Sequence, residues 1–559
     1  MLSNYLKFLY IYKRQIGGKQ QKYWDTLSHN AVLFPPDYEK KNIPVIKNNE
    51  EILLNKEAEE AAFFYAKYVG SEYLKNPKFN KNFWNDFKKL LDSNIKINSL
   101  EEIDFSRMKD YLEKERMKRL DMTKEQKEEI KNKTKEKEDI YKYAVLDGKN
   151  QEVGNFRIEP PSIFIGRGCH PQIGKIKRRV YPKDITINIG REAEIPKHNY
   201  EGQKWGKIIH DKSVSWLASW DDNITGKIKY VRLGDYSDFK SESDINKFEL
   251  ARKLKKKLGE IRKLNDNNLI SDSLKMQQLS TGLYLIENFS LRVGNEKNID
   301  EADTVGVSSL RVEHITLLER NRIKLDFLGK DSVRYSKKIE VNNLIFNNIK
   351  SFIEGKKKKD PIFDKMSPSD LNSYLQKMMT GLTTKVFRTM NASKLFQKEL
   401  NKVSTKFENY DKEDRIILIL DEYNKANAKV AILCNHQKNI NKNFSKSINL
   451  IMEKIKKYKK KRKILEDKKT EYKMKNKDTK SVKSKIIKID MNIKKLKSKR
   501  LAKTEMKNVS LGTSKVNYID PRITVAFMKK NNLDIIKLFS NTLQLKFKWA
   551  LDVDDSFAF

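Results

Sequence analysis

The sequence predicts an α+β protein of several domains, mainly helical and with a stretch of short strands in its first half. Its 559 residues exceed what one hydrophobic core usually organises. The spacing of apolar residues changes along the chain from a helical period to a period of two and back again. With 38% hydrophobic and 34% charged residues, the chain is polar but has enough apolar side chains to fold.

The N-terminal part of the sequence predicts helices. Residues 1–22 show no clear periodicity, and from Trp24 onward aromatic residues are dense. The helical spacing of Ala61, Phe64 and Tyr68 predicts a small α-rich domain. Residues 108–142 carry mixed charge with little apolar content, which predicts one exposed helix with many ion pairs and a domain boundary.

The middle of the chain changes to strands and then returns to helices. Between about residues 155 and 235, segments 185–189 and 228–232 alternate apolar and polar side chains, as half-buried strands do. Helical spacing returns at 246–264 and at 273–291. The sequence therefore predicts a mixed α/β first half followed by a helical region.

Two local motifs predict particular structures further along. Residues 323–327 alternate up to Gly329 and residues 333–335 alternate away from it, which predicts a β-hairpin with Lys330 at its turn. Ser367 and Pro368 precede Asp370, the pattern of a capped helix start with proline in its first turn.

Residues 438–507 differ from the rest of the chain because they hold 27 Lys and Arg against 7 Asp and Glu, a net charge of +20. Their apolar residues keep heptad spacing in two halves around a turn-like break at 475–478; these are Ile451, Ile455, Tyr458 and Leu465, then Val482, Ile486, Ile489, Ile493 and Leu496. The pattern predicts two basic helices folded as an antiparallel coiled coil. The alternative is a disordered lysine-rich tail, which does not require heptads.

Composition excludes several classes of protein. Cys169 and Cys434 are the two cysteines, which excludes a disulfide-stapled scaffold and a four-cysteine zinc site. The longest apolar run, residues 5–12, is too short to cross a bilayer, so we expect a soluble intracellular protein. The net charge of +41 indicates a polyanionic partner, although lysine-rich codon usage is an alternative cause.

Familiar local motifs of nucleotide and metal chemistry fail on inspection. Gly166-Arg167-Gly168 lacks the third glycine of a dinucleotide fingerprint, and Gly174-Lys175 lacks the following Ser or Thr of a P-loop. The six histidines are scattered along the chain. Local motifs therefore predict neither nucleotide-driven nor metal-dependent chemistry.

Five short segments each place a basic or nucleophilic residue among glycines and small polar residues. They are residues 291–297 around Arg292, 329–331 around Lys330, 385–389 around Arg388, 435–437 around His436, and 513–522 around Tyr518. Taken singly, each has an ordinary structural explanation such as a surface ion pair, a helix cap or a packed ring.

Together and in this order the segments resemble the eukaryotic type IB DNA topoisomerases. The resemblance spans Trp24 to Phe559, and its longest stretches are Ile158-Glu159-Pro160-Pro161, Gly166-Arg167-Gly168-Cys169-His170-Pro171, Ala302-Asp303-Thr304-Val305-Gly306, Leu310-Arg311-Val312-Glu313-His314 and Ser514-Lys515-Val516-Asn517-Tyr518. Residues 1–22 depart from the family, which has a long charged region with nuclear-targeting signals in that place.

The resemblance implies a set of catalytic residues. Tyr518 would attack a DNA phosphodiester and form a 3′-phosphotyrosine link. Arg292 and Arg388 would hold the non-bridging phosphate oxygens, because a guanidinium matches phosphate geometry. His436 would donate to one of these oxygens, and Lys330 would protonate the departing 5′-oxygen.

The resemblance also implies the partners of the chain. Its DNA-contacting residues would be Arg167, Lys229, Asn295, Lys297, Asp331, Lys385, Asn435, Thr513 and Asn517. Of these, Arg167, Asp331 and Asn517 would line the pocket that camptothecin-type poisons occupy in the family. It implies double-stranded DNA as partner, no cofactor, no metal, no membrane association, a monomer and a nuclear location.

The implied fold is a DNA clamp with a mixed α/β N-terminal half, a mainly α catalytic domain of tyrosine-recombinase-like fold, an antiparallel coiled-coil linker and a small α C-terminal domain. The expected divisions are a short N-terminal segment 1–23, a cap domain 24–237, a catalytic core 238–438, a linker 439–507 and a C-terminal domain 508–559.

Two other functions remain open at this point. A tyrosine site-specific recombinase uses much the same residue types on a related fold, but the basic segment between His436 and Tyr518 favours a topoisomerase. A non-catalytic basic DNA-binding protein would use only the charge. Residues 459–463 are typical of a nuclear localisation signal, and equally of a solvated helix face.

Overall fold

The computed structural model describes residues 22–295, 301–403, 412–437, 443–475 and 477–559. The chain divides into two compact units. Unit 1 consists of Met1–Asp244 with Lys297–Asp303, and unit 2 consists of Ile245–Glu296 with Thr304–Phe559. Among the described residues, no helix combines the length and the apolar character needed to cross a membrane.

One half of unit 1 is a helical subdomain built on aromatic packing. Its helices are α2 (Lys56–Ala66), α3 (Pro77–Phe87), α4 (Ser106–Asp121) and α5 (Lys124–Asp139). Asn76 caps α3 by accepting from the Lys78 amide, with Pro77 in the first turn. Phe79, Phe83 and Phe87 recur every four residues and are fully buried, and the Phe83 ring stacks on Tyr65 of α2.

The charged segment expected to form one exposed helix over 108–142 forms two. Helix α4 ends at Asp121, and Met122 has an extended ψ of 137°. Thr123 then starts α5 with a capping box, in which its side chain and that of Gln126 each bond the other's backbone amide. The single-helix prediction is therefore wrong, because the capping box at Thr123 starts a new helix.

Unit 1 also contains short strands, some of which pack in the core of the helical subdomain and the rest in a second core. They are β1 (Leu27–His29), β2 (Val45–Lys47), β3 (Glu50–Ile52), β4 (Tyr143–Leu146), β5 (Lys149–Glu152), β6 (Ser162–Ile163), β7 (Ile176–Lys177), β8 (Thr186–Asn188), β9 (Lys207–Ile209), β10 (Trp216–Asp221) and β11 (Ile228–Arg232). The largest sheet has the order β11-β10-β8-β9, with β8 and β9 parallel. Strands β1, β4 and β5 form a second sheet, and Ile185, Ile187 and Val231 lie in the core between these strands.

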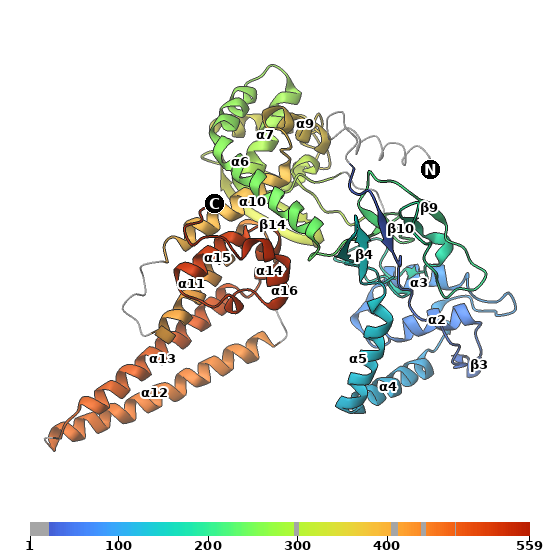
Figure 1. Cartoon of the computed structure of the whole chain (residues 1–559), viewed down its shortest axis with the longest axis horizontal. Coiled ribbons are helices and arrows are strands. Elements are labelled where there is room, and N and C mark those ends of the chain that lie inside the picture. Colours follow the sequence, from blue (N-terminus) through green and yellow to red (C-terminus); the bar gives the residue numbers. More distant parts are fainter. Residues whose placement is uncertain (1–21, 296–300, 404–411, 438–442, 476) are drawn as a thin grey trace. The chain divides into compact units, whose positions relative to one another are not determined.

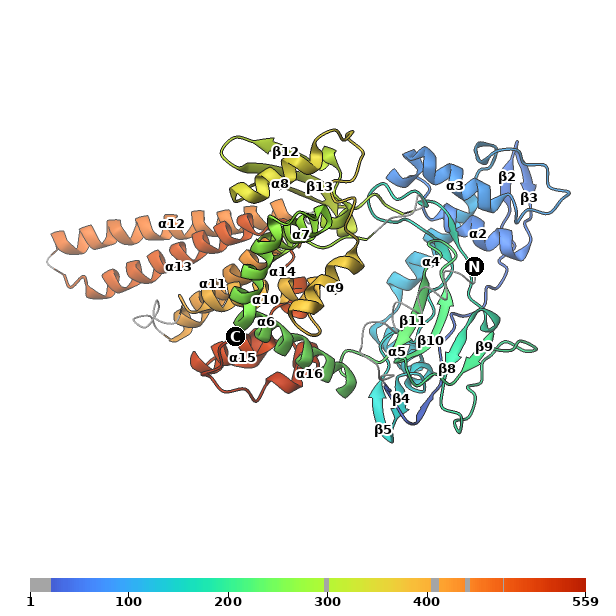
Figure 2. The same cartoon turned by 90° about the horizontal axis from the view of Figure 1, so that it is seen from above.

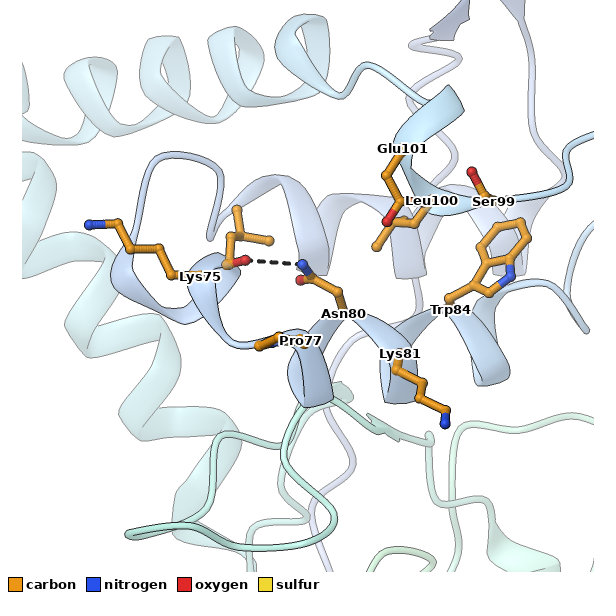
Figure 3. A pocket seen from close by; sticks show the side chains of 9 residues that line it. Lys75, Pro77, Asn80, Lys81, Trp84, Ser99, Leu100 and Glu101 are labelled. Atoms are coloured by element: carbon orange, nitrogen blue, oxygen red, sulfur yellow. Dashed lines mark hydrogen bonds between the residues drawn. The ribbon is translucent and has the colours of Figure 1, made fainter.

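Unit 1 also has a surface pocket beside α3 (Figure 3). Asn80 crosses its floor, where the side-chain amide donates to the Leu74 carbonyl at 3.0 Å. Trp84 and the 3-10 turn Leu100–Glu102 form one wall. The pocket contains none of the residues that the sequence predicts to be functional.

Unit 2 combines helices with one antiparallel sheet. The helices are α6 (Asp238–Leu269, which begins in unit 1), α7 (Leu274–Phe289), α8 (Asn343–Ile353), α9 (Pro368–Met378), α10 (Thr384–Leu400), α11 (Lys412–Leu433), α12 (Phe444–Met474), α13 (Lys480–Glu505), α14 (Leu511–Asn517), α15 (Pro521–Lys530) and α16 (Asn541–Lys546). The sheet has the order β12 (Ile315–Leu318), β13 (Arg322–Gly329) and β14 (Val333–Glu340). The predicted helix start at Ser367 is present with its capping box to Asp370.

The C-terminal residues share the main core of unit 2. Ile519, Ile523 and Phe527 belong to the same buried cluster as residues of α10 and α11. The hydroxyl groups of Tyr423 on α11 and Thr524 on α15 lie 2.9 Å apart and are buried. Helices α14 and α15 are therefore held against α10 and α11, which positions the segment around Tyr518.

Helices α12 and α13 form an antiparallel pair that extends from the rest of unit 2 (Figures 1 and 2). The heptad residues are buried or half-buried, whereas Ile464 and Ile487, outside the heptads, are 64% and 60% exposed. Arg462 on α12 donates to Asp490 on α13 at 2.6 Å, and Lys503 reaches Ser447. The heptads therefore predicted the contacting faces correctly, and the supercoil of a coiled coil stays a prediction.

A buried histidine makes the stability of unit 1 sensitive to acid. His29 accepts from the Ala31 amide at Nδ1 (3.0 Å), and its Nε2 lies 2.9 Å from the Asn188 carbonyl. The ring is therefore neutral with its proton on Nε2, and protonating Nδ1 would remove an acceptor. Burial lowers the pKa of His29 to about 4, against a smaller opposing effect of the Asn188 carbonyl.

We expect unit 1 to lose stability as the pH falls from 7 to 5. The unfolded chain binds a proton on His29 below about pH 6.5 and the folded chain does not, so acid favours unfolding. The loss due to His29 is on the order of 2 kcal/mol. Tryptophan fluorescence in urea measures it, because five of the six tryptophans lie in unit 1.

The comparison is between the unchanged chain, His29→Asn and a control at the exposed His210, His210→Gln. The pH-dependent loss should shrink in His29→Asn and persist in the control. An equal loss in all three proteins would contradict this role for His29.

Candidate active site

The candidate site is organised around Arg388, on the buried face of α10 in unit 2. Helix α7 ends at Phe289, and Ser290 turns the chain away in the left-handed region with φ 52°. This turn aims the Ser290 carbonyl at Arg388, whose Nη1 donates to it at 2.8 Å. Asn391, one turn further along α10, donates to the Ser290 hydroxyl at 3.0 Å and holds the turn in place.

Arg388 is a buried cation. Its side chain and backbone are together 7% exposed, and Nη2 donates to the Cys434 carbonyl. The Nε–H is buried without any hydrogen-bond acceptor, and within the described residues no carboxylate pairs with the guanidinium. Burial lowers the pKa of Arg388 below its ordinary value, and the nearby positive charge of Arg292 lowers it further. A buried, unpaired guanidinium of this kind favours binding of an anion.

The end of α11 places His436 beside Arg388. Asn435 adopts the left-handed conformation with φ 52°, and the His436 amide donates to the Ala431 carbonyl at 2.8 Å. The Asn435 amide donates to Ile432, which completes a Schellman C-cap. His436 Nε2 lies 3.4 Å from Arg388 Nη2, and Nδ1 lies 2.7 Å from the hydroxyl of Ser514.

The histidine ring is neutral over the physiological pH range. It is 8% exposed. Burial lowers the pKa of His436 to about 3, with further contributions from the positive charges of Arg388 and Arg292. A neutral imidazole has one N–H donor and one acceptor nitrogen, so His436 can donate a hydrogen bond to an anion from only one side of the ring.

Tyr518 lies over both of these side chains. Its ring stacks on His436 with centroids 5.3 Å apart and an interplanar angle of 29°, and the Arg388 guanidinium lies 5.2 Å from the ring centroid. The backbone is held from α10, because the buried Ser393 hydroxyl donates to the Tyr518 carbonyl at 3.1 Å. The same hydroxyl accepts from the Asp520 amide at 3.0 Å.

Arg292 lies on a tightly packed loop after α7. Gly294 has φ +88°, and its backbone passes so close to Gly306 that a Cβ on either glycine would lie under 3 Å from the other. The Arg292 carbonyl accepts from Val307 at 2.9 Å. Glycine is required at both positions because the two chain segments leave no room for a side chain. The loop brings the half-buried Arg292 close enough to affect the pKa of both Arg388 and His436.

Lys330 lies at the turn of the β13–β14 hairpin, as its sequence predicts. Gly329 pairs with Val333, and Asp331 has φ 65° in the turn between them. Lys330 is exposed. The turn end of the hairpin is tied to the His436 segment, because the side-chain amides of Asn435 and Gln437 donate to the Arg334 carbonyl at 3.4 and 3.2 Å.

The arrangement therefore combines a phenol, a buried cation and a neutral imidazole on three segments far apart in sequence. A phosphate ester beside Arg388 would fill the unused donor capacity of the guanidinium and lie within reach of the phenol. Such a site suits attack of a tyrosine oxygen on phosphorus with charged donors around the transition state.

Comparison with known protein families agrees with this chemistry. Residues 22–233 match the family "Eukaryotic DNA topoisomerase I, DNA binding fragment", and residues 236–469 match "Eukaryotic DNA topoisomerase I, catalytic core". The chain belongs to the eukaryotic DNA topoisomerase I family. Residues 490–559 match a third family description, "C-terminal topoisomerase domain". The Arg388, His436 and hairpin segments lie in the second match, and Tyr518 lies in the third.

Individual topoisomerase I sequences are similar over nearly the whole chain. DNA topoisomerase 1 beta of Arabidopsis thaliana is 40% identical over 557 residues, covering 97% of this chain and 60% of that protein. DNA topoisomerase 1 of Caenorhabditis elegans is 40% identical, covering 95% and 67%. DNA topoisomerase 1 of Homo sapiens is 39% identical, covering 95% and 71%. The chain thus spans about three fifths to seven tenths of the length of these relatives.

The other predicted site residues fall into two groups. Those in unit 2 are Asn295, Asp331, Lys385, Asn435, Thr513 and Asn517. Lys385 is exposed one turn before Arg388, and the Asn517 side chain donates to the Thr513 carbonyl at 3.0 Å. In unit 1, Arg167 lies exposed between Gly166 and Gly168, both with positive φ, and Lys229 lies 3.6 Å from Asp222. Lys297 lies outside the described residues.

The structure adds supporting residues that the sequence did not reveal. Ser290, Ser393 and Ser514 are buried and bond Arg388, Tyr518 and His436 respectively. Ser514 lies within a stretch that resembles the family, but no local pattern indicates that it contacts His436, 78 residues earlier in the sequence. Ser290 lies directly after α7 and Ser393 lies within α10. An isolated serine at such a position does not indicate a functional contact.

We expect Ser393→Ala to loosen the Tyr518 segment. The substitution leaves the Asp520 amide without its acceptor and the Tyr518 carbonyl without a donor, at a cost of about 1–3 kcal/mol. Hydrogen–deuterium exchange of the peptide containing Asp520 should become faster, and the unfolding free energy of unit 2 should fall. Ser273→Ala, at an exposed serine of the same unit, is the control. Unchanged exchange at Asp520 in Ser393→Ala would show that the hydroxyl does not hold this segment.

Proposed function

We propose that this chain is a type IB DNA topoisomerase, which relaxes positive and negative supercoils by transient cleavage of one strand, controlled rotation and religation. The observation that carries the proposal is Arg388, a buried guanidinium with an unused Nε–H, no carboxylate partner among the described residues and a tyrosine ring over it. The similarity to proteins named DNA topoisomerase 1 supports the same activity.

In the proposed reaction the Tyr518 oxygen attacks a backbone phosphorus. The Tyr518 phenol loses its proton to water, a bond forms between its oxygen and phosphorus, and the bond from phosphorus to the 5′-oxygen breaks. The 3′ end stays attached as a phosphotyrosine. Religation is the reverse step, in which the 5′-hydroxyl attacks and Tyr518 leaves. One phosphodiester replaces another, so the bond energy is kept and no ATP is required.

Charge stabilisation falls to Arg292, Arg388 and His436. The two guanidiniums would bind the non-bridging oxygens, and His436 would donate to one of them from its neutral ring. These donors act in a buried site, where each could contribute on the order of 3 kcal/mol, roughly a hundredfold in rate. The hydrogen bonds from Ser290, Cys434 and Ser514 hold Arg388 and His436 in position before DNA arrives.

Lys330 would supply the proton to the departing 5′-oxygen. Its place at a hairpin tip suits this role, because an exposed, flexible side chain can reach into a DNA groove. The strand directly after the turn is tied to the His436 segment at Arg334, which would keep the tip within a limited range of the phosphate.

The remaining predicted residues would contact DNA around the cleaved phosphate. Asn295, Lys297, Lys385, Asn435 and Thr513 would do so from unit 2 or its adjoining segment, and Lys229 from unit 1. Arg167, Asp331 and Asn517 would form the pocket for camptothecin-type poisons. Residues 24–237 would act as the cap of the clamp and 238–438 as the catalytic core, with a tyrosine-recombinase-like fold.

We expect the chain to relax supercoiled plasmid in EDTA without ATP and Tyr518→Phe to lose this activity. The phenylalanine keeps the ring that stacks on His436 but has no oxygen to attack phosphorus, so binding to duplex DNA should be retained. Tyr472→Phe, on α12, is the matched control and should relax DNA normally. Relaxation by Tyr518→Phe, or none by the unchanged chain, would contradict the proposal.

The helix pair α12–α13 would slow rotation of the DNA through its positive charge. Residues 438–507 carry a net charge of +20, and most of their lysines face solvent. Attraction to passing phosphates depends on counterion release, so it weakens as salt rises. We also propose that the chain acts as a monomer, on DNA in the nucleus.

Replacing the exposed Lys459, Lys460 and Lys461 by glutamine should speed relaxation per cleavage event at low salt. When the logarithm of processivity is plotted against the logarithm of salt concentration, the magnitude of the slope should fall by about one for each phosphate that a lysine no longer neutralises. Deleting the helix pair should have a larger effect in the same direction. Processivity and salt dependence unchanged by the deletion would exclude this role.

A further inference from the structure

The contact between His436 and Ser514 carries an inference that the family resemblance did not include. Ser514 lies on α14, four residues before Tyr518, and is fully buried. Its hydroxyl lies 2.7 Å from His436 Nδ1, a short hydrogen bond between buried groups. The opposite nitrogen, Nε2, faces Arg388 at 3.4 Å. The two nitrogens therefore face different kinds of partner.

The hydrogen bonds around the ring determine where its single proton lies. A guanidinium can only donate, so Nε2 accepts from Arg388 while no anion is present. The proton is then on Nδ1, which donates to the Ser514 hydroxyl. In this tautomer His436 offers no N–H on the side that faces Arg388 and Tyr518.

The proposed reaction requires the other tautomer. When phosphate oxygens accept from Arg388, His436 can stabilise them only with a proton on Nε2. Nδ1 must then accept a hydrogen bond, and the group beside it must donate. A serine hydroxyl can do either, because it has one donor and two acceptor positions and rotates freely. Changing the tautomer releases one proton to water and takes up one from water, so the ring stays neutral.

We propose that Ser514 is a positioning residue that holds His436 and sets the tautomer of its ring. The direction of the hydrogen bond between Ser514 and His436 reverses when DNA phosphate binds. This inference rests on the proposed function. Ser514 does not touch the substrate in this account. It acts through His436, and it links the ring to the helix that carries Tyr518.

The first test measures single-turnover cleavage of a duplex by the full chain. Ser514→Ala should cleave on the order of tenfold more slowly than the unchanged chain, with duplex binding retained, because Nδ1 loses its donor. Ser514→Thr keeps a hydroxyl and should restore part of the rate. In a His436→Gln background, Ser514→Ala should add no further loss. An added tenfold loss in that background would show that Ser514 acts on something other than His436.

The second test reads the tautomer directly and does not depend on folding of a serine variant. The ¹⁵N resonances of the imidazoles are recorded for Tyr518→Phe alone and bound to duplex DNA, with His436→Gln identifying the His436 signals among six histidines. The proton should be on Nδ1 in the free protein and on Nε2 in the complex. The same tautomer in both states would overturn the proposal.

The two proposals fail in different ways. No covalent adduct from the unchanged chain would overturn the topoisomerase function itself. An adduct from the unchanged chain, together with equal cleavage by Ser514→Ala, would overturn only the role of Ser514.

Discussion

The site depends on burying the Arg388 guanidinium, which no carboxylate among the described residues neutralises. A carboxylate partner would stabilise the charge but would also compete with phosphate for the same donors. Two backbone carbonyls, those of Ser290 and Cys434, supply part of the compensation instead. Both carbonyls belong to helix ends that turn through left-handed residues, Ser290 after α7 and Asn435 after α11. The helix terminations of unit 2 thus keep a buried cation available for an anion.

The same helix ends bring the reacting groups together. The Schellman cap of α11 places His436, the Ser290 turn leads into the Arg292 loop, and α10 holds the Tyr518 segment through Ser393. The positive charge therefore has two separate uses. Much of it is spread over the exposed faces of α12 and α13, where it would attract DNA without fixed geometry under the proposed function. A few cations in the site are buried or half-buried, and Arg388 is held by directed hydrogen bonds.

Local patterns predicted some of this structure and long-range contacts decided the rest. The Lys330 hairpin, the capped helix at Ser367 and the contacting faces of α12 and α13 follow from turn residues, caps and heptads within a few residues. The break at Thr123 was readable from its capping box and was missed because the charge pattern continues through it. The Arg388 contacts to Ser290 and Cys434 join residues 98 and 46 positions apart, so no local pattern could reveal them.

The covalent intermediate is the central claim of the account. A duplex labelled at one strand, mixed with the full chain and quenched with denaturant, traps the adduct, and protease digestion with mass spectrometry then identifies the attached peptide and the DNA end. We expect the DNA to be joined through its 3′-phosphate to the peptide containing Tyr518, with a free 5′-hydroxyl on the other fragment. Attachment through a 5′-phosphate, or to a different residue, would contradict the account.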